Sequence, residues 1–186
     1  MKALEIDGIA ATVEHIKDKS YKITRPFNIV TKGTASDLES DFISFILSRE
    51  GQSIVRENNY VPVLDDSTAF TSSKLNGKLV IAGSTAVTPV MEKLKESYEK
   101  LNPDAKVEIQ MTDSTSGIRA LINGTCDIGM SSRELTPEEE EQASATVIAI
   151  DGIAVIVSKD NQHTGLTTDE VQRIFAGEIT NWDDVQ

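Results

Sequence analysis

Three short loops carry the side chains best suited to chemistry. They read "GSTAVT" at 83–88, "DSTSGI" at 113–118 and "SSREL" at 131–135, and each follows an apolar stretch with the pattern of a strand. Hydroxyl groups and the N–H groups at the start of a helix can bind an oxyanion without the help of a lysine. One such loop is more often a helix cap, because Ser and Thr are preferred there. Three of them at the ends of successive parallel strands favour an anion-binding site.

The charged residues near these loops leave two interpretations open. Arg133 can form a bidentate contact with an oxyanion, or it can pair with the acidic helix predicted after it. Asp127 is expected to orient a loop. The glutamates at 138–141 are interpreted as a solvated helix face and not as a metal site, because neighbouring carboxylates on a helix point in different directions.

Catalysis has little support in the sequence. A serine nucleophile needs a nearby base, and both histidines, His15 and His163, lie outside the three loops. "GSTAV" is not a G-x-S-x-G elbow, and "GSTAVT" is not a Walker loop. Cys126 is the only cysteine, which excludes an internal disulfide, and it is expected to be a buried hydrophobe. We therefore predict a protein that is not an enzyme and uses no metal or cofactor.

The composition narrows the choice of partners. The net charge is −12 and Lys and Arg form no cluster, which is unlike a nucleic-acid-binding protein. An acidic protein that binds an anion must rely on local dipoles. No apolar stretch reaches the roughly 18–20 residues needed to cross a bilayer. The residues after Met1, "KALEIDG", do not have the pattern of a signal peptide.

Strands and helices alternate in the second half of the chain, which predicts an α/β fold. Ser36 and Glu39 are expected to form a capping box, Thr136 and either Thr167 or Thr168 to cap later helices, and Pro89 to lie in a first turn. The stretch "ATVIAIDGIAVIVSKD" is long enough for two strands or for one that bends at Gly152. Residues 64–77, "LDDSTAFTSSKLNG", are polar and without periodicity, so they are expected to form an exposed connection.

The order of these motifs resembles a known family. "GKLVIAGSTAVTPVMEKLKESYEK" with the following residues up to "SSREL" resembles the amino-terminal part of the PstS-type phosphate receptors of ABC transporters, and "IDGIAVIVSKDN" with "LTTDEVQRIFAGEITNWDDV" resembles the next part. "KALEIDGIAATVEHIKDKSYKITRPFNIVTKG" and "FISFILSREGQSIVRENNYVPV" resemble the family's carboxy-terminal part. The family's tail therefore precedes its head, and most of its second lobe is missing.

The resemblance implies a single lobe of the type II periplasmic-binding-protein-like fold, circularly permuted. Its sheet is expected to be mostly parallel with one antiparallel strand and with helices on both faces. Residues 1–63 correspond to the family's carboxy-terminal segment, 64–73 to a linker and 74–186 to the amino-terminal segment. Together they are expected to form one α/β domain. An engineered rearrangement is favoured over a natural one.

The resemblance also implies non-catalytic binding of inorganic phosphate. By motif position, the contacts fall on Ser84, Thr85 and Ala86, on Ser114, Thr115, Ser116 and Gly117, and on Ser132 and Arg133. Ser132 stands where some members carry an aspartate, which weakens the case for selecting the protonated ligand through a carboxylate. Because the contacts of the second lobe are missing, weak affinity is expected. The alternative is an engineered scaffold that binds no ligand.

Further expectations concern partners and location. The parent receptor would dock on an ABC permease, and the exposed inter-lobe face of this chain would favour a homodimer. The parent would be extracellular and membrane-anchored, or periplasmic. Without a signal peptide, this chain would stay in the cytoplasm if expressed as it is.

Overall fold

The computed structural model describes residues 1–185, which divide into two compact units. The small unit comprises residues 1–24 and 152–185, and the sheet unit comprises residues 25–151. This differs from the single α/β domain expected from the sequence. The physical reason is that the two ends of the chain bury their own apolar cluster, whose members are Leu4, Ile6, Tyr21, Leu166, Ile179 and Val185.

The small unit contains two short two-stranded sheets. In one, β1 (Lys2–Ala3) pairs antiparallel with β9 (Ile156–Val157), and in the other β2 (Glu5–Ile6) pairs parallel with β10 (Gly165–Leu166). Its helices are α1 (Val13–Lys17), α7 (Thr168–Phe175) and the 3-10 helix η1 (Trp182–Asp184). None of the loops predicted to bind an anion belongs to this unit.

The sheet unit is built on one mixed six-stranded sheet in the order β4-β8-β3-β7-β5-β6. The strands are β3 (Thr24–Thr31), β4 (Val61–Pro62), β5 (Gly77–Ser84), β6 (Ala105–Thr112), β7 (Ile128–Ser131) and β8 (Ser144–Gly152). The helices are α2 (Asp37–Leu47), α3 (Arg49–Glu57), α4 (Thr88–Leu101), α5 (Ser114–Ile122) and α6 (Pro137–Glu140). The long apolar stretch around Gly152 thus forms two strands, β8 and β9.

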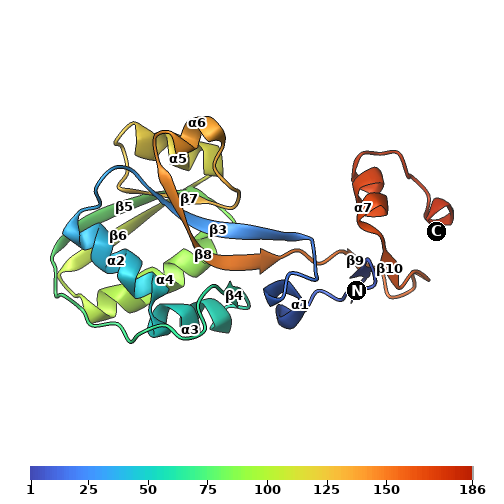
Figure 1. Cartoon of the computed structure of the whole chain (residues 1–186), viewed down its shortest axis with the longest axis horizontal. Coiled ribbons are helices and arrows are strands. Elements are labelled where there is room, and N and C mark those ends of the chain that lie inside the picture. Colours follow the sequence, from blue (N-terminus) through green and yellow to red (C-terminus); the bar gives the residue numbers. More distant parts are fainter. Residues whose placement is uncertain (186) are drawn as a thin grey trace. The chain divides into compact units, whose positions relative to one another are not determined.

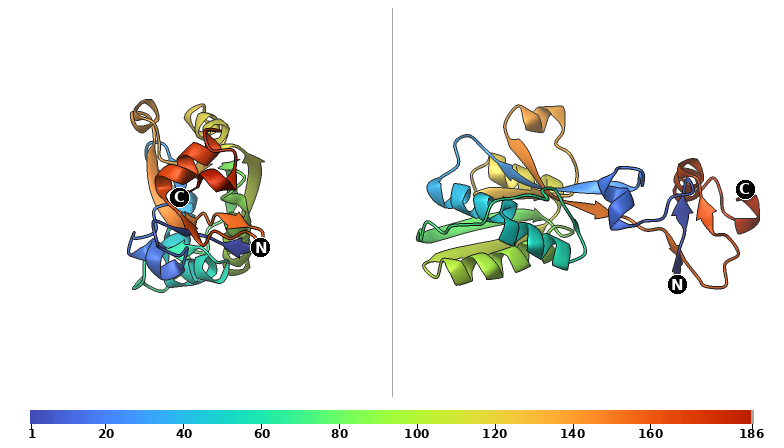
Figure 2. Two further views of the ribbon diagram at one scale, coloured as in Figure 1. Left: turned by 90° about the vertical axis from the view of Figure 1, so that its right-hand side faces the viewer. Right: turned by 60° about the horizontal axis from the view of Figure 1, so that its bottom comes forward.

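Helices cover both faces of this sheet, as predicted (Figures 1 and 2). The side chains of β5 alternate between the two faces, as strand geometry requires. Leu79 and Ile81 belong to the main core with α2, α3 and α4, whereas Ala82 belongs to a smaller cluster with Ile118 and Leu121 of α5. The sequence pattern therefore identified the layers of this unit correctly.

Three neighbouring strands at one side of the sheet, β7, β5 and β6, run in the same direction. β5 pairs parallel with β6 on one side and with β7 on the other, with Ser84 opposite Thr112 and Gly83 opposite Met130. β3 pairs antiparallel with β7, and the short strand β4 adds a second antiparallel pairing with β8. The carboxyl ends of β5, β6 and β7 consequently lie at one edge, where the three loops begin.

Side chains cap the helices where the sequence predicted caps. The described capping boxes join Ser36 to Glu39, Thr136 to Glu139 and Thr167 to Glu170. Pro89 lies in the first turn of α4, as expected. Among residues 1–185, no helix combines the length and the apolar character that a membrane crossing would need.

The connection at 64–73 is mostly exposed, as expected, but Phe70 packs against the sheet unit. The Phe70 ring lies 5.2 Å from the ring of Phe45 and 6.2 Å from that of Tyr98, measured between centroids. The Phe70 N–H donates to the Glu50 carboxylate at 2.7 Å, and the Ser72 hydroxyl donates to the side chain of Asn102. The expectation of a solvated linker at 64–73 is therefore wrong at Phe70, because one aromatic anchor does not produce a periodic pattern.

Two glycines allow close contacts around β5, one with α5 and one with β7. Gly83 has φ +143°, and a Cβ there would collide with the backbone oxygen of Met130. A Cβ on Gly117 would collide with the Cα of Gly83 and the backbone oxygen of Ala82. A side chain at Gly117 would push α5 away from β5, whereas one at Gly83 would push β5 away from Met130 of β7.

We expect Phe70→Ala to lower the free energy of unfolding by about 2 kcal/mol, because it removes a half-buried ring from the main core. Urea unfolding followed by circular dichroism measures this. Leu64→Ala is the matched control, since Leu64 lies in the same connection but is 43% exposed, and it should change stability by about 0.5 kcal/mol or less. Equal effects of the two substitutions would contradict the packing of Phe70.

Gly117→Ala should destabilise the protein by about 2 kcal/mol or more, although alanine is intrinsically better than glycine in a helix by about 1 kcal/mol. The reason is the collision with β5. Arg119→Ala, an exposed substitution on the same helix, serves as the control. A thermal unfolding curve for Gly117→Ala at or above that of the parent chain would refute the close contact.

Candidate functional site

Three serines from the three predicted loops meet at the edge of the sheet. Ser84 ends β5, Ser114 begins α5 after β6, and Ser132 follows β7. The Ser84 hydroxyl donates to the Ser132 hydroxyl at 3.0 Å, and the Ser132 N–H donates to the Ser114 hydroxyl at 3.1 Å. The hydroxyl oxygens of Ser114 and Ser132 are 3.5 Å apart. We call these three residues the serine cluster.

The first loop leads into a helix whose start has no side-chain cap. The N-cap residue of α4 is Val87, and no side chain accepts a hydrogen bond from its first turn. The other six α-helices described in residues 1–185 are each capped by a Ser, Thr or Asp side chain. The first turn of α4 also contains no acidic residue. No side-chain cap or acidic residue in the first turn therefore offsets the partial positive charge of the N–H groups at this helix start.

The other predicted residues of the first loop lie near the surface. Thr85 is exposed and Ala86 is half-buried, whereas Ser84 is only 3% exposed. The Ala86 N–H makes a long hydrogen bond of 3.3 Å to the Ser84 hydroxyl, and the Thr85 N–H donates to Thr112 at 3.2 Å. Ser84 thus lies beneath the loop, and Thr85 and Ala86 form its outer surface.

The second loop uses some of its predicted donors within the helix itself. The Asp113 carboxylate accepts from the Ser116 N–H at 2.9 Å and from the Ser116 hydroxyl at 2.6 Å. The Gly117 N–H donates to the Asp113 carbonyl at 3.0 Å. The hydrogen bond from the Ser116 side chain, followed by that from its backbone, lowers the pKa of Asp113, which is therefore ionised at neutral pH. Of this loop, Ser114 is the residue that the structure brings into the serine cluster.

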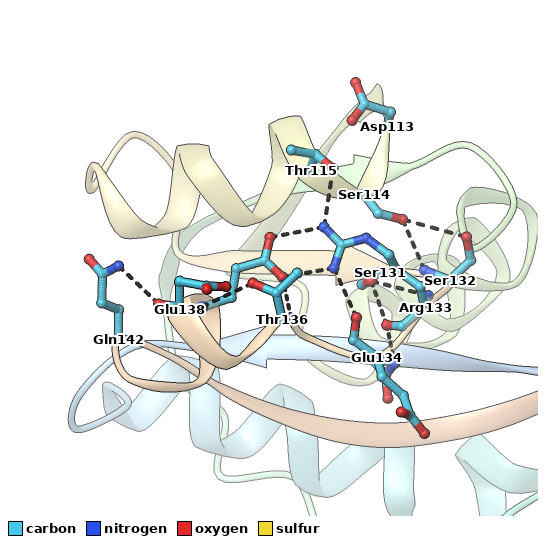
Figure 3. Close-up of polar contacts among 12 residues, drawn as sticks. Asp113, Ser114, Thr115, Ser131, Ser132, Arg133, Glu134, Thr136, Glu138 and Gln142 are labelled. Atoms are coloured by element: carbon cyan, nitrogen blue, oxygen red, sulfur yellow. Dashed lines mark hydrogen bonds and ion pairs between the residues drawn. The ribbon is translucent and has the colours of Figure 1, made fainter.

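Arg133 is held by the acidic helix, which is one of the two roles left open by the sequence. Its guanidinium binds both carboxylate oxygens of Glu139, at 2.7 and 2.9 Å. It also donates to the Thr115 hydroxyl at 3.1 Å and to the Glu134 carbonyl at 2.8 Å (Figure 3). The hydrogen bond from Arg133 lowers the pKa of Glu139, so both partners are charged at neutral pH.

Buried polar side chains fix the backbone of the third loop. The Arg133 carbonyl accepts from Asn28 at 2.9 Å and from the Ser131 hydroxyl at 2.7 Å. Asn28 is 2% exposed and Ser131 is completely buried. Asp127 accepts from the Val80 N–H at 2.7 Å and so ties the start of β7 to β5, in keeping with the orienting role expected of it.

The remaining reactive side chains lie elsewhere. His15 and His163 belong to the small unit, where His15 contacts the Ala10 carbonyl and His163 lies against Trp182. Cys126 is buried, and burial raises the pKa of its thiol to about 11, as expected for a packed hydrophobe. Among residues 1–185, no group of three or more His, Cys, Asp or Glu side chains could hold a metal ion.

A family model, curated protein sequences and solved structures all match this chain to the same family of binding proteins. Residues 68–186 match the model of the PBP superfamily domain. The chain is 52% identical over 187 aligned residues to phosphate-binding protein PstS 2 of Streptococcus agalactiae, an alignment that covers 100% of this chain and 64% of that protein. A crystal structure of the phosphate-binding protein of a phosphate ABC transporter from Streptococcus pneumoniae matches with a TM-score of 0.92 and 45% identity, over 100% of this chain and 72% of that one.

A more distant relative was solved with its ligand. A substrate-binding protein of a phosphate ABC transporter from Clostridium perfringens, with bound phosphate, matches with a TM-score of 0.51 and 36% identity. The alignment covers 58% of this chain and 45% of that one.

The alignments also bear on the order of the segments. The family model begins to match at residue 68, within the connection at 64–73. The S. agalactiae protein matches this chain from end to end, so the same order of segments occurs in a naturally occurring protein. An engineered rearrangement is not needed to explain it. The chain spans about 64% of the length of the curated relatives.

The family match over more than half of the chain and the structural match over its whole length agree with the fold and with the strand-end loops described above. The chain belongs to the PBP superfamily and, within it, to the PstS-type phosphate-binding proteins.

Proposed function

We propose that the strand-end loops bind a tetrahedral oxyanion without catalysing a reaction, and that this anion is inorganic phosphate. The observation that carries this proposal is the position of the serine cluster beside the uncapped start of α4. A helix start without an acidic cap attracts an anion, and the hydroxyls add donors that can rotate toward it. The names of the relatives, which are phosphate-binding proteins, support phosphate as the anion.

In this proposal the ligand replaces weak contacts within the site. The hydroxyl–hydroxyl distances of 3.0 and 3.5 Å in the serine cluster join groups that can each donate to a phosphate oxygen instead. Thr85 and Ala86 form the outer surface of the first loop and add a hydroxyl and an N–H group. The Ser116 and Gly117 N–H groups are bonded within α5, so we assign them to the support of the loop.

The serine cluster does not select between protonation states as a carboxylate would. A hydroxyl can donate to a bare phosphate oxygen or accept from a protonated one. We therefore propose that residues 1–185 bind phosphate and sulfate with similar affinity, since both are tetrahedral oxyanions.

The affinity of the chain by itself should be weak. It spans about 64% of the length of its curated relatives, and contacts made by the rest of such a protein would be missing. Hydrogen bonds to charged groups contribute about 1.5–3 kcal/mol each. The loss of two or three would move a micromolar site to a dissociation constant of about 1 mM or more.

The assembly of the whole receptor follows from the same proposal. The S. pneumoniae protein is the phosphate-binding protein of a phosphate ABC transporter, so we propose that an intact counterpart of this chain docks on such a permease, outside the cytoplasmic membrane. We further propose that the segment order is a circular permutation of the order in other PstS-type receptors. Homodimerisation of this chain stays a prediction, which sedimentation velocity can check.

Titration of the chain with phosphate should give saturable shifts of the amide resonances of residues 84–88, 114 and 132, with a dissociation constant of about 1 mM or more. Heteronuclear NMR at constant ionic strength measures this, with sodium chloride as the control salt and sulfate as the competing oxyanion. Shifts no larger than those caused by chloride would support the alternative of a scaffold without a ligand. A submicromolar constant would refute the expected weakness.

Ser114→Ala and Ser132→Ala should each weaken phosphate binding by about fivefold to tenfold, because each removes a donor to the anion. Ser44→Ala is the matched control, because its exposed hydroxyl lies on α2 and donates to the Ser40 carbonyl. The comparison uses the same NMR titration, with thermal unfolding to verify the fold. Unchanged affinity in both cluster variants would place the anion elsewhere.

A further inference from the structure

The carboxylate of Glu139 connects three structural elements through one arginine. Glu139 lies in α6, Arg133 lies in the loop after β7, and Thr115 lies in the first turn of α5. One carboxylate oxygen accepts from Arg133 at 2.7 Å and from the Thr136 N–H at 2.9 Å. The other accepts from Arg133 at 2.9 Å. The same guanidinium then donates to the Thr115 hydroxyl.

The direction of Arg133 argues against a direct role in anion binding. Its guanidinium lies between Thr115 and Thr136, turned away from the hydroxyls of Ser114 and Ser132 (Figure 3). Both of its terminal nitrogens are engaged, with Glu139, Thr115 and the Glu134 carbonyl. A bidentate ion pair also fixes the plane of the guanidinium, which a single contact would leave free to rotate.

The ion pair is placed where it can control the geometry of the serine cluster. Arg133 directly follows Ser132, and Thr115 directly follows Ser114. The Arg133–Thr115 hydrogen bond therefore lies next to the bond from the Ser132 N–H to the Ser114 hydroxyl. The side chains of Arg133 and Glu139 are only 36% and 15% exposed, so solvent weakens the pair less than it would at the open surface.

We propose that Glu139 is a positioning residue for the anion site. Through its bidentate ion pair with Arg133, it fixes the loop after β7 against the start of α5. This contact holds Ser132 and Ser114 at the spacing that the ligand needs. It also keeps the arginine charge away from the ligand. The inference rests on the proposed phosphate site for its effect on binding, but the locking of the loop can be measured without any ligand.

The test compares Glu139→Gln with Glu140→Gln, which removes the same charge from an exposed position on the same helix. In Glu139→Gln, amide hydrogen exchange of Ser132 should accelerate about tenfold or more, because the loop opens more often. In Glu140→Gln it should match the parent chain. Equal exchange at Ser132 in the two variants would overturn the inference, whatever the result with phosphate.

Phosphate titration of the same variants separates positioning from charge. Removal of a nearby negative charge should by itself strengthen anion binding slightly, and Glu140→Gln measures this effect. Glu139→Gln should instead weaken binding about fivefold, and Arg133→Lys should weaken it similarly, because lysine keeps the charge without the bidentate geometry. Tighter binding in Glu139→Gln than in Glu140→Gln would show that Arg133 binds the anion once it is released from Glu139, and would overturn the inference.

Faster exchange at Ser132 in Glu139→Gln, with no phosphate binding by the parent chain, would refute the phosphate site. The role of Glu139 in fixing the loop would then still be supported.

Discussion

The contact between α5 and β5 is the constraint on which the site depends. Gly117 lies directly on Gly83, and neither position has room for a Cβ. β5 lies between the two other parallel strands, β6 and β7. The contact therefore fixes how far along the strand direction α5 begins, relative to the ends of β5 and β7. The hydrogen bonds of the serine cluster join residues at the ends of β5 and β7 and at the start of α5, so they depend on this alignment.

Charge is organised locally around this framework. The chain carries a net charge of −12, so its overall field opposes an anion. Two carboxylates on the elements that carry the serine cluster or adjoin it accept hydrogen bonds from neighbouring donors: Asp113 from Ser116 and Glu139 from Arg133. The start of α4 is left without an acidic cap. In the proposed function, this arrangement offsets the unfavourable overall field at the position of the anion.

The sequence was sufficient for the features that depend on local patterns. The three loops at one sheet edge, the caps at Ser36 and Thr136 and the helices on both faces were all predicted and are confirmed. Features that depend on contacts between distant or aperiodic residues were not predicted. A single aromatic ring, Phe70, anchors the connection at 64–73, and the chain ends fold into their own small unit.

The site itself was predicted in part. Ser84, Ser114 and Ser132 do come together, but sequence could not decide whether Arg133 binds an anion or the acidic helix, because that depends on where the next helix begins. An available signal was overlooked at Asp113. An aspartate just before a helix is a preferred N-cap, which accounts for its capture of the Ser116 N–H.

The most direct test of the central claim is a crystal structure of the chain grown in phosphate at a concentration well above the expected dissociation constant. The account predicts a tetrahedral anion at the start of α4, within hydrogen-bonding distance of the Ser114 and Ser132 hydroxyls, with Arg133 still bound to Glu139. An ordered phosphate bound elsewhere, with the Ser84–Ser132 hydrogen bond intact and no anion at α4, would contradict it.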